Sequence, residues 1–431
     1  MVAMESERGG FEHLTRGRRV LAMGSLVAAG EAIFFLPFVV ARVFRPTLLD
    51  VFGLTNFELG TAFSVYGVVA MAAYFAGGFL ADRYPANRLM GVALGATALG
   101  GIVLAQVPGL GTLRILFGYW GLTTIFLFWA ALIRATRMWG GTDRQGSAYG
   151  MLDGGRGLFA AVMASVGVAI FAAMLPGDVA TATLAERSAA LVRAIWVFTA
   201  MTIAAGLLVW VALPNDSPRD GEQRRKRPTF GIEVLRMPTV WVQAVIVLCA
   251  YVGYKSSDDF GLYVRDAFGY DDVAAARLST ISFWIRPFAA LGAGLLADRM
   301  RPSRVLVIGF SVLILGSLTI ASGSLEPDLP WLIVVTVAAT AVGMHSLRGV
   351  YFAVMGEAEI PWAVTGSAVG VISLVGFTPD VFWGPLSGLL LDRSPGAAGH
   401  QHLFAVVAAF ALGGLLASLV VPRLARAARR T

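Results

Sequence analysis

Apolar runs of about twenty residues recur along most of this 431-residue chain. The hydrocarbon core of a bilayer is about 30 Å thick, and an α-helix needs about 20 residues to cross it. Apolar windows of that length occur at residues 20–41, 58–80, 89–107, 112–135, 147–174, 191–213, 238–262, 274–297, 305–323, 330–353, 364–391 and 402–422. The sequence therefore predicts an all-α membrane protein with twelve transmembrane helices.

Composition agrees with a membrane protein and excludes several other classes. Apolar residues make up 57% of the chain and charged residues only 14%, against roughly 25% in soluble domains. Cys249 is the single cysteine, so neither an internal disulfide nor a multi-cysteine metal site can form. The sequence has no Gly-x-x-x-x-Gly-Lys-Ser/Thr loop and no histidine pair at metal-binding spacing. We therefore expect no enzymatic activity, no cofactor and no metal.

Positive charges are concentrated in alternate loops. If the chain starts in the cytoplasm, most of its 34 lysines and arginines lie in cytoplasmic segments, so we expect both termini there. The net charge of +7 would then face the cytoplasm and anionic lipid. The basic stretch 224–227 has no interleaved aromatic residues, which argues against a nucleic-acid partner. The expected location is the inner (plasma) membrane.

A long polar loop divides the chain into two halves of six spans each. The predicted parts are an N-terminal cytoplasmic tail (1–19), a first six-helix bundle (20–213), the central cytoplasmic loop (214–237), a second six-helix bundle (238–422) and a basic cytoplasmic tail (423–431). The halves share a sequence pattern, because residues 78–83 (GFLADR) end the second span and residues 294–299 (GLLADR) end the eighth. Such internal duplication is typical of transporters.

This paired pattern resembles the G-x-L-a-D-R signature of the major facilitator superfamily, and the resemblance covers essentially the whole chain. Arg114 and Gly118 in the fourth span are similar to the family's R-x-x-x-G motif. The resemblance implies two pseudo-symmetric bundles of six helices that move a solute by alternating access in a bacterial membrane. It favours organic-anion carriers over drug antiporters, since the fifth span lacks the proline that drug antiporters of the family carry there.

The same resemblance implies a gating role for the charged residues of both copies, which are Asp82, Arg83, Arg88, Asp298, Arg299 and Arg304. In the family fold, Asp82 would face the start of the eleventh span and Asp298 the start of the fifth when the cytoplasmic side is closed. A carboxylate is stabilised near a helix N-terminus by the helix dipole. The alternative is that these residues only anchor helix ends at the membrane surface.

Cationic side chains deep in the spans are expected to bind substrate, since a charge in hydrocarbon is costly without a partner. Arg286 is the clearest case, because its own helix offers no acidic residue within one turn. Nitrate carriers of the family have a second arginine in span two, where this chain has Ala70, and that disfavours nitrate. The expected substrate-binding residues are Arg286, Arg156, Lys255, Tyr254, Trp284, Tyr66 and Phe35.

Carboxylates inside the spans are the candidates for carrying protons, namely Glu31, Asp380 and Asp153. Glu31 stands alone in an apolar run, and Asp380 follows a proline that frees backbone carbonyls. Structural ion pairs are the alternative to these roles. The competing pairings are Glu31 with Arg156 or Arg286, Asp153 with Arg156, and Lys255 with Asp258 or Asp259.

These features predict a secondary transporter for a small organic anion, a carboxylate, coupled to protons or to exchange with a counter-substrate. Two alternatives stay open. The first is efflux of an amphipathic or cationic compound by proton antiport, with Glu31 as the acid. The second is a membrane receptor that uses the fold without transport. The expected partners are the small-molecule substrate, protons or a counter-substrate, and the lipid bilayer around a monomer.

Overall fold

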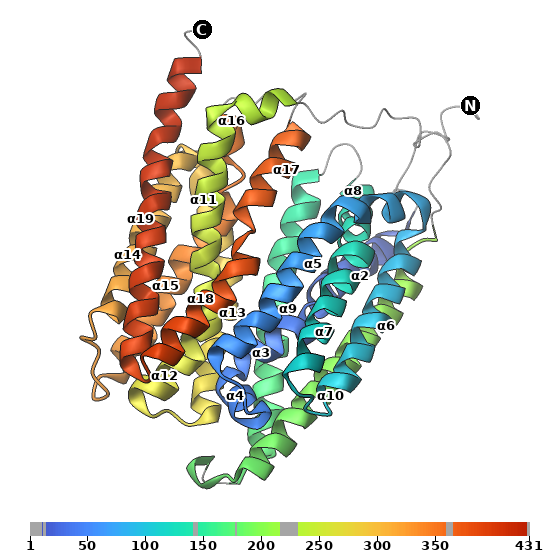
Figure 1. Cartoon of the computed structure of the whole chain (residues 1–431). Helices are drawn as coiled ribbons and strands as arrows, with labels where there is room; N and C mark the ends of the chain where they lie inside the picture. Colours follow the sequence, from blue (N-terminus) through green and yellow to red (C-terminus); the bar gives the residue numbers. More distant parts are fainter. Residues whose placement is uncertain are drawn as a thin grey trace. The chain divides into compact units, whose positions relative to one another are not determined.

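The computed structural model describes Phe11 and residues 14–140, 145–176, 179–215, 232–358 and 365–428. Every regular element within these ranges is helical (Figure 1). Eleven helices there are long and apolar enough to cross a membrane, and a twelfth is counted if the bent pair Arg16–Ala32 and Phe35–Val43 forms one span. The prediction of an all-α membrane protein with up to twelve spans is confirmed. The cytoplasmic location of the termini stays a prediction.

Helices of the N-terminal half begin and end close to the predicted spans. In chain order they are α2 (Arg16–Ala32), η2 (Phe35–Val39), α3 (Val40–Val43), α4 (Arg45–Phe52), α5 (Asn56–Arg83), α6 (Ala86–Leu104), α7 (Leu110–Gly121), η3 (Leu122–Trp129), α8 (Ala130–Gly140), α9 (Gln145–Ala173), η4 (Val179–Thr181) and α10 (Leu184–Ala212). The first span is interrupted where η2, a π-helical turn, contains Pro37. Proline has no backbone N–H to donate, and its ring crowds the preceding turn, so it kinks or interrupts a regular helix.

The C-terminal half contains further interruptions. Its elements are η6 (Ile232–Arg236), α11 (Pro238–Lys255), η7 (Ser256–Asp259), α12 (Phe260–Phe268), α13 (Asp272–Arg299), α14 (Pro302–Ala321), α15 (Pro330–Val350), α16 (Val354–Glu357), α17 (Thr365–Gly376), α18 (Pro379–Arg393) and α19 (Ala397–Ala428). The predicted eleventh span divides into α17 and α18 at Phe377 and Thr378, just before Pro379. The seventh span passes from α11 through the 3₁₀ turn η7 into α12.

The described residues fall into two compact units. Unit 1 contains those within 1–54 and 65–225, and unit 2 contains those within 55–64 and 226–431. The first residues of α5 cluster with the C-terminal half, and the predicted division into two six-helix bundles stays a prediction. Residues 216–231 of the predicted central loop lie outside the described ranges.

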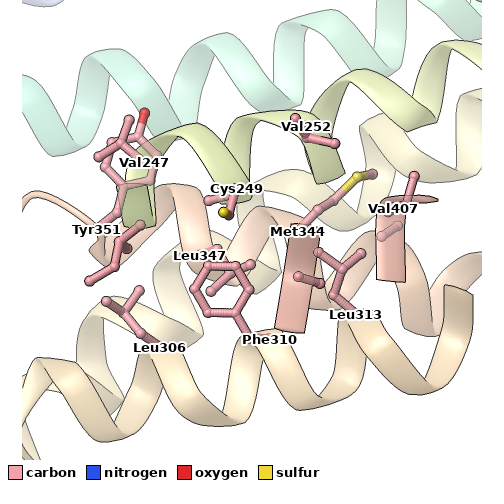
Figure 2. Close-up of a cluster of buried hydrophobic side chains, with 14 of the residues drawn as sticks. Val247, Cys249, Val252, Leu306, Phe310, Leu313, Met344, Leu347, Tyr351 and Val407 are labelled. Carbon is pink, nitrogen blue, oxygen red and sulfur yellow. The ribbon is translucent and has the colours of Figure 1, made fainter. Parts of the chain in front are cut away.

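An apolar core supports α11 in unit 2 (Figure 2). Cys249 and Val252 of α11 lie among side chains of α14, α15 and α19, including Phe310, Leu313 and Val407. A Cβ added at Gly253 would lie 2.6 Å from a methyl carbon of Leu313, so the absence of a side chain there allows the close packing. Between helices inside a membrane, such contacts rather than water exclusion hold the bundle together. The partly buried Tyr251 and Tyr254 alternate with these core positions along α11.

Candidate functional site

A buried lysine and two carboxylates meet in unit 2. Lys255 Nζ lies 3.5 Å from Asp380 Oδ1 and 3.6 Å from Asp258 Oδ2. Lys255 is the last residue of α11, and Asp380 lies in the first turn of α18. Helix dipoles favour a cation at a C-terminus and an anion at an N-terminus, so both helix ends stabilise the charges they carry. Only 3% of Lys255 is exposed, which makes the pair a functional candidate inside a membrane span.

Tyr251 holds the Asp380 carboxylate in place. Its hydroxyl donates to both carboxylate oxygens, at 3.0 Å from Oδ1 and 3.1 Å from Oδ2. Tyr251 precedes Lys255 by one helical turn, so both side chains reach Asp380 from the same side of α11. The ring of Phe377, in the break before α18, packs edge-on against Tyr251 with the centroids 5.0 Å apart. The carboxylate therefore has an O–H donor and a cation on fixed supports, and its role in carrying protons stays a prediction.

An aromatic ring also lies close to the lysine. Lys255 Nζ lies 5.2 Å from the centroid of Phe63, which belongs to the part of α5 that clusters with unit 2. A cation over an aromatic face gains about 0.5–2 kcal/mol, more when water is excluded. Phe63 is 5% exposed, so the contact is largely dry.

A second polar group surrounds Tyr254, the residue before Lys255 on α11. The guanidinium of Arg348 stacks on Tyr254 at 3.9 Å from the ring centroid, and the ring of His345 lies 6.1 Å from the same tyrosine. His345 Nε2 is 3.2 Å from the hydroxyl oxygen of Ser282 on α13. Arg286 follows Ser282 by one turn on α13 and is 8% exposed. A guanidinium stacked by its face keeps in-plane N–H groups for hydrogen bonds, the geometry that suits a carboxylate.

Unit 1 contains an ion pair of the same kind. Arg156 Nε on α9 lies 3.2 Å from Glu31 Oε2 on α2, with side-chain exposures of 11% and 5%. The guanidinium carbon is also 5.7 Å from the ring centroids of Phe34 and of Trp129. Of the pairings left open by the sequence, the structure shows Glu31 with Arg156 here and Lys255 with Asp258 in unit 2. The side chain of Asp153 on α9 is exposed.

The remaining aromatic candidates lie in different environments. The hydroxyl of Tyr66 is 2.8 Å from Thr124 Oγ1, and its ring packs edge-on against Phe38. Phe35 is fully buried and stacks on Phe159 at 5.9 Å between centroids. Trp284 is 41% exposed. A substrate-binding role for Tyr66, Phe35 and Trp284 stays a prediction.

The charged residues of the repeated signature lie at helix ends. Arg83 ends α5 and Arg88 lies in the first turn of α6, while Asp298 and Arg299 end α13 and Arg304 follows in α14; all five are exposed. The side chain of Asp82 lies outside the described part of the structure. Their gating role stays a prediction.

Both signature turns are held by residues that the sequence pattern did not indicate. In unit 1, Arg134 Nη1 donates to the carbonyl oxygens of Ala81 and Tyr84. In unit 2, the Glu357 carboxylate accepts from the backbone N–H of Ser303, at 2.9 Å, and from its hydroxyl, at 2.7 Å. A cation therefore fixes the first turn through its carbonyls, and an anion fixes the second through its donors.

Sequence reasoning also missed Phe63 beside Lys255, and Asp392, whose carboxylate accepts hydrogen bonds from the first residues of α5. A phenylalanine in an apolar span carries no mark that separates a lipid-facing ring from one over a cation. An aspartate at a helix end is likewise ordinary. No local signal distinguishes either residue.

Comparison with known proteins identifies relatives along the whole chain. A family model described as the Major Facilitator Superfamily matches residues 21–378. Inner membrane protein YihN of Escherichia coli K12 is 24% identical over 404 residues, which cover 92% of this chain and 93% of the relative. Inner membrane protein YqcE of the same organism is also 24% identical, over 398 residues that cover 90% of this chain and 91% of that protein.

Solved structures share the fold at lower identity. A mutant form of the nucleoside transporter NupG superposes with a TM-score of 0.74 at 13% identity, covering 94% of this chain and 99% of that one. A bacterial homologue of the human lysosomal transporter Spinster, in an inward-facing and unoccupied conformation, gives a TM-score of 0.72 at 13% identity, covering 95% and 98%. At these identities the likeness shows the fold alone.

Proposed function

The chain belongs to the Major Facilitator Superfamily, and we propose that this inner-membrane transporter moves a small organic anion, a carboxylate, coupled to protons or to exchange with a second anion. One observation carries the proposal. Lys255, buried in a span, is neutralised by a carboxylate that comes from another helix and is itself held by a tyrosine hydroxyl. A carboxylate of a substrate has the same chemistry as the one it would replace.

The exchange at Lys255 conserves charge. When Asp380 takes up a proton it becomes neutral, and Lys255, which keeps Asp258 as one neighbour, can then accept the carboxylate of the substrate in place of Asp380. The site gains one proton and one anion together, so its net charge does not change in an environment where an uncompensated charge is costly. The hydroxyl of Tyr251 donates to Asp380 in either protonation state. Proton and anion would therefore bind as a pair.

Three further cations inside the spans extend this scheme. Arg286 and Arg348 of unit 2 supply guanidinium groups suited to a carboxylate, and we assign them to the rest of the anion. The Glu31–Arg156 pair of unit 1 offers a second carboxylate that a proton can neutralise. Efflux of a cationic compound is less well supported, because that function needs a carboxylate available to the compound, whereas Glu31 and Asp380 each lie beside a cation.

Transport assays in proteoliposomes test the proposal. We expect labelled small carboxylates to exchange across the membrane and to accumulate when the proton gradient points inward. Asp380→Asn imitates the protonated acid, so it should keep exchange and lose the response to the proton gradient. Lys255→Met should lose both activities.

The surface pair Arg187 and Asp50 provides a matched control. Arg187 Nη1 lies 2.9 Å from Asp50 Oδ2, with side-chain exposures of 28% and 35%, so Arg187→Met removes the same kind of pair outside the candidate site. This variant should transport normally. Anion transport that is unchanged in Lys255→Met, or no carboxylate transport by the unaltered protein, would reject the proposed function.

A further inference from the structure

The first residues of α5 are attached to α18 within unit 2. We call residues 55–64 the docking segment. The carboxylate of Asp392 accepts from the backbone N–H of Asn56 at 3.1 Å, from Asn56 Nδ2 at 3.1 Å and from the backbone N–H of Phe57 at 2.8 Å. These N–H groups have no partner inside their own helix, and a carboxylate is favoured there by the dipole. Asp392 therefore acts as a helix cap that belongs to a different helix.

Glycines allow the backbones of the docking segment and α18 to approach each other closely. A Cβ added at Gly60 would lie 2.1 Å from the carbonyl oxygen of Gly384, and one added at Gly388 would lie 2.5 Å from the carbonyl carbon of Asn56. Real Cβ contacts are never so short, so even a methyl group at either place would force the helices apart. The docking segment and α18 thus pack backbone to backbone.

The C-terminal end of the docking segment reaches the Lys255–Asp380 pair. The hydroxyl of Ser64 donates to the carbonyl of Val381, the residue next to Asp380. The preceding residue, Phe63, covers Lys255. One short stretch of helix therefore contacts Lys255 through an aromatic face, and the backbone of the residue next to Asp380 through a hydroxyl.

We propose that docking of residues 55–64 on α18 is coupled to the charge state of the Lys255–Asp380 pair, that Phe63 carries the coupling, and that Asp392 sets the strength of docking. The docked segment covers the charged pair with an aromatic ring and excludes water. A change in the pair, by a proton on Asp380 or an anion on Lys255, then alters the affinity of the segment for α18. By thermodynamic reciprocity, loosening the segment alters the stability of the pair to the same degree. The inference rests on the proposed function only in naming proton uptake by Asp380 and anion binding at Lys255 as the events that change the charge of the pair.

A cysteine reporter measures docking directly. Ala62 lies in the docking segment and is 0% exposed, so a maleimide can react with Ala62→Cys only when the packing around this segment opens. Cys249→Ser removes the native thiol, the only one in the chain. In membranes we expect Asp392→Asn to raise the labelling rate at least threefold. The box formed by Thr55 and Glu58 still caps α5, so the helix itself is retained.

The coupling is read from pairs of variants. Asp380→Asn should change the labelling rate at least threefold when Phe63 is present. Phe63→Leu keeps an apolar side chain but removes the ring. In this background the labelling rates with and without Asp380→Asn should be nearly equal. Asp271→Asn serves as the control, because Asp271 caps its own helix α13 through the N–H of Ala274 and makes no contact with the docking segment that the structure shows. Thermal unfolding identifies variants that fail to fold.

Two outcomes would overturn the inference. One is a labelling rate in Asp392→Asn that equals the rate in the parent protein, which carries only Ala62→Cys and Cys249→Ser. The other is a change in labelling rate caused by Asp380→Asn that is the same with and without the ring of Phe63. Labelling needs no substrate, so it separates this inference from the proposed function. If labelling responds as expected but no carboxylate is transported, only the proposed function is wrong. If Asp380→Asn removes the proton response in transport but labelling is unchanged, only the coupling is wrong.

Discussion

Nε of Arg156 lies 3.2 Å from Oε2 of Glu31, so a guanidinium of α9 and a carboxylate of α2 form one ion pair inside unit 1. Gly30, next to Glu31, contributes to this arrangement, because a Cβ there would lie 3.0 Å from Arg156 Cδ. Two aromatic rings, of Phe34 and Trp129, complete the surroundings of the guanidinium. With both charges nearly enclosed, each depends on the other for neutralisation.

Removing one member of this pair should cost more stability than removing both. Glu31→Gln or Arg156→Met leaves one buried charge, and we expect each to lower the free energy of unfolding by about 3 kcal/mol. The double variant leaves no charge and should recover at least half of that loss. Thermal unfolding of the three variants in detergent measures the effect. A double variant that loses the sum of the single losses would contradict the dependence of each charge on the other.

Arg286 should be required for anion transport. A guanidinium that binds a carboxylate contributes a charge-assisted hydrogen bond worth about 1.5–3 kcal/mol, so Arg286→Ala should reduce the initial uptake rate at low substrate concentration at least tenfold. Arg277 lies on the same helix with an exposed side chain, and Arg277→Ala is the control. Uptake into proteoliposomes decides between them. Equal rates in the Arg286 variant and the control would remove Arg286 from the substrate site.

Tyr251 should stabilise the fold through Asp380. Tyr251→Phe keeps the ring and removes the O–H that donates to the carboxylate, at a cost of about 1.5–3 kcal/mol because the acceptor is charged. In the Asp380→Asn background the acceptor is neutral, so the same substitution should cost about 1 kcal/mol or less. A double-mutant cycle of thermal unfolding gives the difference. A cost that is equal in both backgrounds would show that the hydroxyl acts on something other than Asp380.

Gly60→Ala should hold the docking segment away from α18. The added methyl group would overlap the carbonyl oxygen of Gly384, and backbone atoms cannot swing aside as a flexible side chain does. The Ala62→Cys reporter should therefore label at least as fast as in the Asp392→Asn variant. Gly294→Ala is the matched control, since a Cβ at Gly294 meets nothing within 4 Å. If the Gly60 variant labels at the parent rate, the close approach of the two backbones is not maintained in the membrane.

The helices were predictable from the sequence because a membrane span leaves a strong local signal. Uniform apolar runs gave the number of spans, and Pro379 marked the place where α17 and α18 separate. The side-chain contacts between helices were harder to predict. Each residue turns a helix by about 100°, so the neighbour of Glu31 or Lys255 depends on helix rotations that no local pattern determines. The sequence could therefore offer Arg156 only as one of two partners for Glu31, beside Arg286.

The contacts of the docking segment illustrate the same limit. Gly384 and Gly388 of α18 were visible in the sequence, but the helix that they contact was not. A glycine is compatible with an open surface, as at Gly294, or with a backbone contact, as at Gly384. The difference arises only when another helix approaches.

The interruption at Phe377 and Thr378 gives α18 a pivot at one end and Asp392 near the other. Fifteen helical residues extend about 22 Å, at about 1.5 Å each, so a tilt of about 10° at the pivot would displace Asp392 by roughly 3–4 Å. That shift exceeds the tolerance of a hydrogen bond. Because Asp380 lies directly beside the pivot, α18 can act as a lever that magnifies a small rearrangement at one carboxylate into the making or breaking of bonds at another.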